Sequence, residues 1–448
     1  MKKIILSFCS ILVVSIGLAQ QPAAKEMTLE QCLAYALGNS EAIMISQLSI
    51  KKADADVREI ISYGLPRADL QGGLNYNYKV QTSLVDASNF DPSLPEGTLT
   101  EIQFGLPYDG RVNFGINQLI FDGSYFVGIE AAKTFRELSR KENQRTEINV
   151  IEAVSKAYYT VLISETQVFL LNENFNRLDT LLRETQQMYQ NGFAEQIDID
   201  RIRVSYNNVK VSLETQVQLL EISRKLLNFQ MGLDLNQNML LITQLTDVNL
   251  AVPEIEASFD YNDRIEYSQV QTNQHLARLD KKNHQSGYLP KIYAGFNYGY
   301  NSARSDASLL FSEKWYDFGS LGATLSIPIF DGFYKRSKIQ QIQINIEQLD
   351  FQKSSLEKSI DIEIQQARIN LQSNLNVLDI QKENQALAEN IFRISKIKFQ
   401  QGVGSNLELT NADNEFKTAQ SNYLAALYQS ILSKIDLLKA TGILQASK

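Results

Sequence analysis

The sequence is poor in the residues on which most enzymes and metal sites depend. Its 448 residues include only 2 cysteines, 2 histidines, 8 prolines and 1 tryptophan. Two cysteines cannot form a disulfide framework or a zinc ribbon, and His275 and His284 lack the helical spacing of a zinc protease. A formal net charge of −8 argues against a nucleic-acid binder, which needs a basic surface. We therefore predict no catalytic residues, no metal site and no cofactor.

The N-terminus indicates export. Residues 1–20 begin with Met-Lys-Lys, continue as an apolar run and end in Ala-Gln, which is typical of a cleaved secretory signal peptide. The alternative, a buried first helix, fits the short apolar run and the polar chain after it less well. Cys9 would leave with this peptide, so Cys32 is the one thiol expected in the mature chain, as a small residue on a helix face.

Four pairs of landmarks indicate that the chain is an internal duplication. Tyr-Gly-Leu-Pro at 63–66 matches Gly-Tyr-Leu-Pro at 287–290, and Ile-Phe-Asp-Gly recurs at 120–123 and 329–332. The other matches are the glycine turns at 189–192 and 399–402 and the segments at 231–233 and 441–443. The first offset is 224 residues and the others are 209 or 210, which places an insertion of 15 residues in the first repeat. We predict a first repeat over 21–250 and a second over 251–448.

Long stretches without helix breakers predict helices of unusual length. No proline occurs between 108 and 252 or after 328, and residues 333–401 contain no glycine. About 68 residues at a rise of 1.5 Å give a rod of roughly 100 Å, which ends at a glycine turn before a second helix returns. Each repeat should hold one helical hairpin, at about 123–232 and 332–442, that packs on its repeat mate or on another chain.

Ahead of each hairpin, apolar residues alternate with small or polar ones, the period of two that is typical of strands. Strands are expected at about 68–80, 111–121, 290–300 and 315–328, joined by loops at about 81–110 and 301–314. Such strands fit a transmembrane barrel, and equally a half-buried soluble sheet. The signal peptide favours the membrane. Four strands cannot close a barrel, so we expect either a dimer with eight strands or, because one face is rich in Gly, Asn and Ser, a trimer with twelve.

This order of elements resembles the TolC family of outer-membrane efflux proteins. A helix, Leu-Pro, a strand pair, Phe-Asp-Gly, a long helix, a glycine turn and a return helix occur twice after the signal, and the resemblance covers about residues 28–444. It implies an α+β membrane protein, a homotrimer whose 12-stranded β-barrel lies among the lipids of a Gram-negative outer membrane and continues into an α-helical periplasmic barrel. It also implies a periplasmic adaptor and an inner-membrane transporter as partners in efflux or secretion.

An acid lies six residues after each turn glycine, Asp198 in the first repeat and Glu408 in the second. By position alone, such acids serve a helix N-terminus and a solvated surface. The resemblance implies that they belong to a constriction of the tunnel. The implied constriction residues are Asp198, Asp200, Glu408, Asn411, Phe399 and Tyr189, and the implied adaptor-contact tips are Gly192, Phe193, Gly402, Val403, Gly404 and Ser405.

Three of these positions depart from the family pattern. Asn411 stands where the family has a second ring aspartate, Gly404 where it has a gate arginine, and Phe399 where it has a gate tyrosine. The departures leave open how a closed tunnel is held. Two other interpretations of the whole chain remain, a periplasmic coiled-coil scaffold with a small soluble sheet and an adhesin, which would need larger outer loops.

Overall fold

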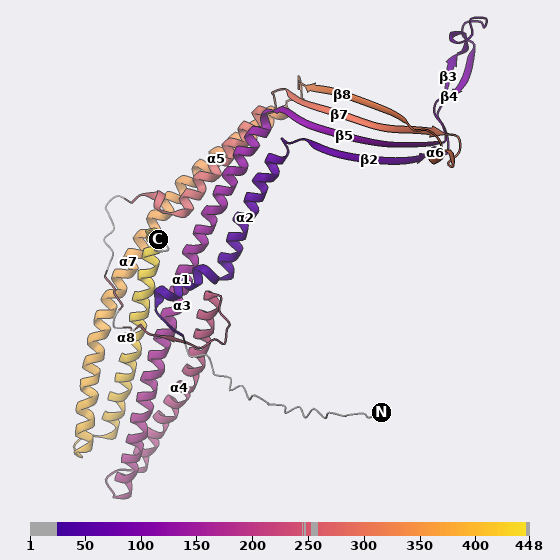
Figure 1. Cartoon of the computed structure of the whole chain (residues 1–448). Helices are drawn as coiled ribbons and strands as arrows, with labels where there is room; N and C mark the ends of the chain where they lie inside the picture. The colour runs from indigo at the N-terminus through magenta and orange to yellow at the C-terminus, as the bar shows by residue number, and fades with distance from the viewer. Residues whose placement is uncertain (1–24, 244, 246–247, 252–258, 445–448) are drawn as a thin grey trace, which may run out of the picture.

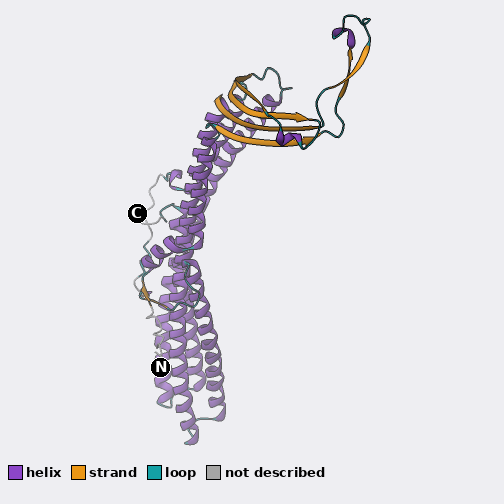
Figure 2. Ribbon diagram, turned by 45° about the vertical axis from the view of Figure 1, so that its right-hand side comes forward, coloured by secondary structure: helices purple, strands orange, loops and turns teal. Residues whose placement is uncertain are grey.

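The computed structural model describes residues 25–444 except 244, 246–247 and 252–258. The predicted signal peptide, 1–20, lies outside these residues. A curved four-stranded sheet lies at one end of a long helical shaft, and both helical hairpins turn at the other end (Figure 1). Figure 2 shows the sheet leaning away from the shaft axis. Within the described residues, no helix is both long enough and apolar enough to cross a membrane.

Two hairpins of very long helices form the shaft. Their helices are α3 (Gly123–Gln190), α4 (Gln196–Met231), α7 (Tyr334–Gln400) and α8 (Asn406–Ala440). At 68 and 67 residues, α3 and α7 are each about 100 Å long. The shorter helices, α1 (Leu29–Asn39), α2 (Glu41–Ser62) and α5 (Ile265–Ser286), pack along them. The predicted combination of long helical hairpins with a small sheet is confirmed.

Both hairpins turn through the same helix C-cap. Gly192 and Gly402 have φ of 79° and 71°, a conformation that glycine adopts without steric cost. The next N–H in each turn donates back to the helix, from Phe193 to Met188 O at 2.8 Å and from Val403 to Lys398 O at 3.1 Å. This is the Schellman pattern, which pairs the last carbonyls of a helix and reverses the chain.

The sheet is antiparallel throughout and has the order β2-β5-β7-β8. Its strands are β2 (Arg67–Tyr76), β5 (Tyr108–Asp122), β7 (Lys291–Arg304) and β8 (Tyr316–Ser326). Strand β2 therefore ends before residue 80, and β7 runs beyond residue 300. The two outer strands, β2 and β8, pair on one side only within the described chain.

The strand register sorts the side chains onto two faces. Leu70, Phe114, Tyr298 and Gly319 are successive partners across the sheet, and they belong to one largely apolar face. On the other face, small and polar residues predominate: Asp69, Gly115, Asn297 and Ser320 are successive partners there. An unpaired edge on either side and one polar face are the properties of a sheet segment that is incomplete by itself.

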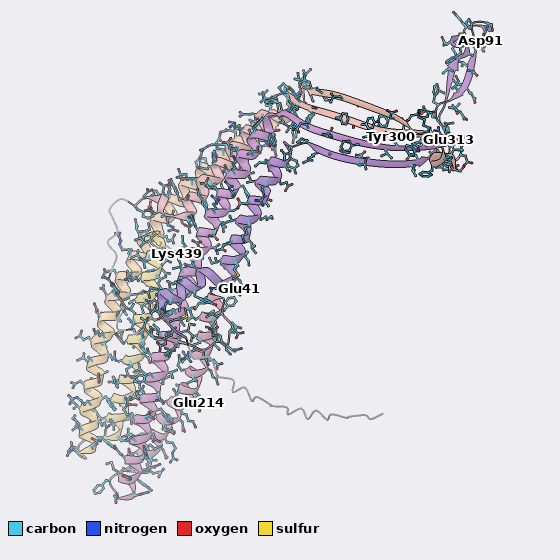
Figure 3. The ribbon with its side chains drawn as sticks, viewed as in Figure 1. Glu41, Asp91, Glu214, Tyr300, Glu313 and Lys439 are labelled. Carbon is cyan, nitrogen blue, oxygen red and sulfur yellow. The ribbon has the colours of Figure 1, made fainter. Side chains whose placement is uncertain are left out.

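Both loops predicted between strands contain secondary structure. The first carries a hairpin of β3 (Thr82–Asp86) and β4 (Leu99–Gln103), with a short 3-10 helix between them, and the second carries α6 (Leu309–Ser312). In Figure 3, Asp91 lies at the far end of the β3–β4 ribbon, well beyond Tyr300 and Glu313 at the end of the main sheet. The connections predicted at about 81–110 and 301–314 therefore contain short elements that the sequence did not predict.

A second small sheet, which the sequence analysis did not predict, lies beside the middle of the shaft. Strand β1 (Lys25–Met27) pairs in parallel with β6 (Met239–Leu241), after the end of α4. It covers a core that includes Cys32 and Tyr158, and the Tyr158 hydroxyl donates to Thr243 Oγ1 at 2.7 Å. Cys32 lies on α1 and is fully buried, as predicted for a small helix-face residue.

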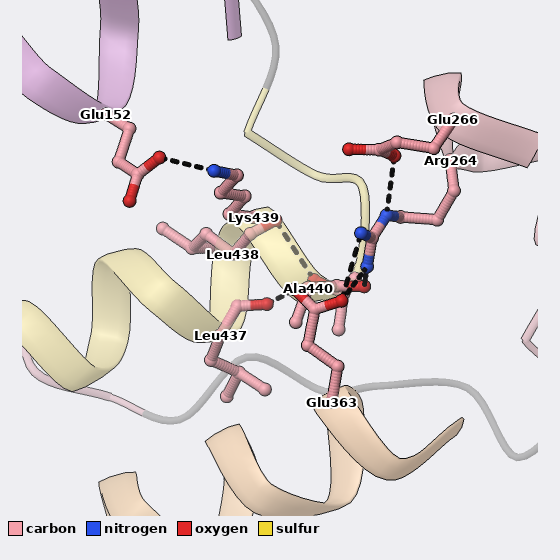
Figure 4. Close-up of polar contacts among 9 residues, drawn as sticks. Glu152, Arg264, Glu266, Glu363, Leu437, Leu438, Lys439 and Ala440 are labelled. Atoms are coloured by element: carbon pink, nitrogen blue, oxygen red, sulfur yellow. Dashed lines mark hydrogen bonds and ion pairs between the residues drawn. The ribbon is translucent and has the colours of Figure 1, made fainter. Parts of the chain in front are cut away.

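Charged contacts join the two hairpins in the middle of the shaft. Lys439 of α8 donates to Glu152 of α3 at 2.6 Å, and Lys156 of α3 pairs with Asp436 of α8 at 2.7 Å. Close by, the buried Arg264 donates to Ala440 O at 2.8 Å and to Glu363 of α7, which ties the end of α8 to α7 and α5 (Figure 4). The two repeats are thus held together along α3 and α8.

Glu152→Gln should lower the free energy of unfolding by about 1–3 kcal/mol at pH 7, because the half-buried carboxylate accepts from two lysines. Burial alone would raise the pKa of Glu152, but Lys156 and Lys439 outweigh it and lower this pKa. A carboxyl with a lowered folded pKa stabilises the fold above its unfolded pKa of about 4.3, and this contribution is lost as pH falls through the folded value. The mutational effect should therefore shrink below pH 4.

Denaturant titrations in detergent, followed by circular dichroism at several pH values, would measure this. The matched control is Glu221→Gln, since Glu221 makes only an exposed pair with Lys225 on the same helix, for which the expected change is below about 1 kcal/mol. An equal effect of the two substitutions would contradict the assigned role of Glu152.

Candidate functional site

The end of the shaft away from the sheet has a core of its own. Side chains of α3, α4, α7 and α8 meet there, and this tip core contains Leu178, Ile202, Phe392, Phe399, Leu409 and Phe416. The guanidinium of Arg177 in α3 lies 4.8 Å from the centre of the Phe392 ring and 2.9 Å from Asp413 Oδ1 of α8. Asp413, whose side chain is 3% exposed, also pairs with Lys417. The two hairpins are thus fastened close to their tips by a buried charge cluster.

The two acids predicted from the turn spacing occupy the same position of their helices. Asp198 and Glu408 are both the third residue, of α4 and α8 respectively. Asp198 Oδ2 accepts from the Glu195 N–H at 3.0 Å, which completes a capping box, and the Glu408 N–H donates to Ser405 Oγ at 3.1 Å. The Asp198 carboxylate therefore caps the start of α4, whereas the Ser405 hydroxyl caps the start of α8 and Glu408 contributes its N–H.

Glu408 has a cationic partner that the sequence analysis did not identify. Lys398 Nζ, at the end of α7, lies 3.2 Å from Glu408 Oε1. Both side chains are about half exposed, so this pair contributes little to stability, but it places a positive charge beside the acid. Asp198 likewise has Arg201 at 3.7 Å.

Of the other predicted constriction residues, three are exposed and one is not. Tyr189, Asp200 and Asn411 are accessible, and Asp200 accepts from Gln196 Nε2 at 3.0 Å. Phe399 is only 6% exposed, because its ring packs inside the tip core. Phe399 lies about 100° around the helix from Lys398, on the side that faces the tip core, and its place in a constriction stays a prediction.

The predicted adaptor-contact tips form the outermost surface of the shaft. Phe193 and Val403, which follow the two turn glycines, are 79% and 81% exposed. Gly192 and Gly402 have open space around them, whereas Gly404 does not. Asn406 Nδ2 donates to Asp198 O at 3.0 Å, so the two tips are joined to each other.

Several tip residues escaped the sequence analysis because their spacing carries no signal. Asp413 and Lys417 are an i,i+4 pair on α8, but Arg177 comes from α3, 236 residues away, and only packing brings it to them. In the described part of the chain, no group of three or more His, Cys, Asp or Glu side chains could hold a metal ion. The site offers exposed apolar tips and acids near helix starts.

Comparison with known proteins identifies the class to which this architecture belongs. The outer membrane efflux protein family matches residues 267–443, within the second repeat. The chain is 21% identical to the outer membrane protein TolC of Vibrio cholerae over 336 residues, which are 74% of this chain and 76% of TolC. It is also 21% identical to the probable efflux pump outer membrane protein TtgC of Pseudomonas putida over 315 residues, 68% of this chain but 62% of TtgC.

Solved structures agree on the fold. The CmeC outer membrane channel of Campylobacter jejuni superposes with a TM-score of 0.73 at 16% identity, over 94% of this chain and 87% of CmeC. The predicted resemblance to the TolC family of outer-membrane efflux proteins is thereby confirmed. The predicted location, the outer membrane with the helical part in the periplasm, is confirmed with it.

Gly404→Ala should loosen the second tip. A Cβ at this position would lie 2.9 Å from Lys398 Cβ and 3.1 Å from the Lys398 carbonyl carbon, so the turn must shift. This crowding also excludes the family's arginine from position 404 in this conformation. A cost of about 1–3 kcal/mol in the local turn should speed trypsin cleavage after Lys398 by about tenfold.

Limited proteolysis with mass spectrometry would measure the cleavage rate. Gly38→Ala is the control, because a Cβ on Gly38 meets nothing within 4 Å. Equal cleavage of the wild type and Gly404→Ala would show that the turn accepts the methyl group.

Proposed function

We propose that this protein is the outer-membrane channel of a tripartite efflux or secretion system. Three copies would form a 12-stranded barrel and a helical tunnel, through which substrates pass from a periplasmic adaptor and an inner-membrane transporter to the outside. One observation carries the proposal: within the described chain, the outer strands β2 and β8 each pair on one side only, so the sheet has two open edges. Strands in a lipid bilayer require closure, since each unpaired backbone group there costs several kcal/mol.

The helices support the same conclusion, because the shaft also has two open sides. Helices α3 and α8 pack on each other, with α4 outside α3 and α7 outside α8 (Figure 1). Each outer helix presents a row of exposed apolar residues. The α4 row is Ile197, Val204, Val211, Ile222 and Phe229, and the α7 row is Ile344, Phe351, Ile362, Ile369, Ile380 and Leu387.

The spacing of these rows favours helix-to-helix packing between copies. Successive members are 7 or 11 residues apart, which is close to two or three whole helical turns, so each row follows one face of its helix. Exposed apolar rows of this length are unusual on a protein that functions as a single chain. A ring of copies would bury the part of the α7 row nearest the tips, Ile369, Ile380 and Leu387, against the α4 row of the next copy, since α4 has 36 residues and α7 has 67.

The tips are the proposed docking end for the adaptor. Gly402→Trp should abolish efflux of a fluorescent substrate in cells that lack the chromosomal gene, although the protein still reaches the outer membrane as an oligomer. The bulky side chain would stand in the open space beside the exposed Val403 and block contact. Dye efflux and the oligomer in outer-membrane fractions would be measured together.

Gly97→Trp is the matched control, because Gly97 also has a positive φ, at 87°, and open space, but lies in the β3–β4 ribbon at the other end of the molecule. Loss of efflux in both variants would mean that strain at the glycine, not contact at the tip, is responsible. Buffer extraction of the wild type without detergent would contradict the channel itself.

The acids near the tips are proposed to line the constriction and to favour cations. In planar bilayers, Asp198→Ala with Glu408→Ala should lower the ratio of cation to anion permeability, since three copies would lose six carboxylates. Lys398→Ala should raise the ratio, because it removes the positive charge 3.2 Å from Glu408. Unchanged ion selectivity in both variants would place these charges outside the conducting path.

A further inference from the structure

The internal duplication is preserved in the pairing of strands residue by residue. In the first strand pair, Arg67 of β2 faces Asn117 of β5; in the second, Lys291 of β7 faces Ser326 of β8. Lys291 is the repeat equivalent of Arg67, and Ser326 is the equivalent of Asn117, by the offsets of 224 and 209 residues. The two repeats therefore build the same strand pair in the same register.

The junction between the repeats has a specific polar contact. Where β5 meets β7, Asp122 and Lys291 are facing residues, and Lys291 Nζ lies 2.8 Å from Asp122 Oδ2. Asp122 is 7% exposed and also accepts from the Ser124 N–H, at the start of α3. The contact fixes the strand junction and the helix start together.

Close apolar packing accompanies that ion pair. A Cβ on Gly123 would lie 2.7 Å from Leu289 Cδ1, the end of a flexible side chain, and 3.3 Å from Ser286 Cβ, so the glycine allows a close approach here. Leu289 in turn lies two residues before Lys291 in the sequence. An acid and a glycine after one strand thus fit a leucine and a cation before the next.

The same four residue types stand at the two open edges of the chain. Asp331 and Gly332 follow β8, as Asp122 ends β5 and Gly123 begins α3. Arg67 begins β2 two residues after Leu65, as Lys291 begins β7 two residues after Leu289. These pairs cannot meet within one chain, because β2 and β8 are opposite edges of the sheet.

In the described chain, the charged side chains at these edges contact residues close to them in sequence, and two apolar side chains beside them are exposed. In the described residues, Arg67 has no carboxylate partner, and its guanidinium lies 4.6 Å from the centre of its own Tyr63 ring. Asp331, which precedes α7, accepts from the Lys335 N–H at 3.2 Å, and within the described residues its ion pair is with Lys335 Nζ, also at 3.2 Å. Ile329 and Phe330, just before Asp331, are 95% and 73% exposed. A cavity of about 570 Å³ beside the start of β2 is lined by Tyr63, Leu65 and Arg67, among others.

We propose that β8 of one copy pairs with β2 of the next in the register of β5 with β7, so that Asp331 of one copy forms an ion pair with Arg67 of its neighbour. The segment 327–333 of one copy then covers the cavity beside β2 of the next, and Gly332 packs on Leu65. The strand junction within the chain and the junction between copies have the same construction.

This register agrees with two independent features of the sequence. It sets Leu321 opposite Tyr76 and Ile327 opposite Leu70, which keeps the apolar face continuous across the junction. It also places Pro328 at the equivalent of Leu119, where β5 has an irregular register against β7. A proline, which lacks an N–H, is accepted at an edge or a bulge and not within a regular central strand.

The inference rests on the proposed function, because it specifies how the copies of a channel meet. Its test is disulfide cross-linking of the chain with Arg67→Cys and Asp331→Cys. Facing residues of antiparallel strands have Cα atoms about 4.5–5.5 Å apart, within the reach of a disulfide. After mild oxidation of outer membranes, denaturing gels without reductant should show most of the chain as a covalent trimer, which reductant returns to the monomer.

Single-cysteine variants and an intrachain cysteine pair are the controls. Each single-cysteine variant should stay monomeric on the gel, and the native Cys32 is buried and so does not contribute. The pair Asp122→Cys with Lys291→Cys should cross-link within one chain and yield no multimer. A double variant at 67 and 331 that assembles as an oligomer on native gels but does not cross-link would overturn the proposed register and leave the channel proposal intact.

A charge exchange tests the ion pair separately. Arg67→Asp should lower the temperature at which the oligomer dissociates in detergent, and Arg67→Asp with Asp331→Arg should restore it. Lack of restoration, with cross-linking retained, would show that the strands pair as proposed but the ion pair does not contribute. A wild-type protein that is monomeric in both the membrane and detergent would overturn this inference and the proposed function alike.

Discussion

Backbone hydrogen bonding at the edges of the sheet is the constraint on which the rest of the structure depends. A strand in a bilayer must have partners on both sides, and four strands leave two rows of unpaired groups. The sheet has one polar and one apolar face. At its internal junction between β5 and β7, Asp122 pairs with Lys291, and an acid and a cation recur at the two open edges as Asp331 and Arg67. The helices follow this geometry, because each long helix begins at or just after the end of a strand: α3 after β5 and α7 after β8.

The helical shaft extends for about 100 Å from the sheet to the hairpin turns, and charged contacts join the two repeats at two levels along it. The pairs of Glu152 with Lys439 and of Lys156 with Asp436 hold the repeats together in the middle of the shaft, and the pair of Arg177 and Asp413 does so near the tips. Between these levels the helices meet through apolar packing and through polar contacts such as Thr160 with Tyr428 at 2.9 Å and Arg224 with Glu165 at 2.8 Å. A long helical wall with two fastening levels is stiff along its length.

Long elements were predictable from the sequence, and short or packed ones were not. The hairpins follow from the absence of proline and glycine, and their turns from Gly192 and Gly402, because both signals are local. The β3–β4 ribbon was missed because Pro92, Pro95 and Pro107 mark the segment as a loop and its strands have only five residues each.

The candidate site was predictable in position but not in orientation. The turn glycine places Glu408 at the third residue of its helix, as found. Which side of α7 faces the core is decided by packing, so the sequence could not show that Phe399 is buried while Lys398 reaches Glu408. The roles of these residues in a constriction and at an adaptor contact stay predictions.

The β3–β4 ribbon has a different relation to the rest of the molecule. Its two strands pair only with each other, and its turns are closed by its own side chains, such as Asp86, which accepts from the Gly97 N–H at 2.9 Å. Changes there need no compensation in the sheet or the helices. The ribbon can therefore accept substitutions or an inserted peptide while the four-stranded sheet and the helices stay the same.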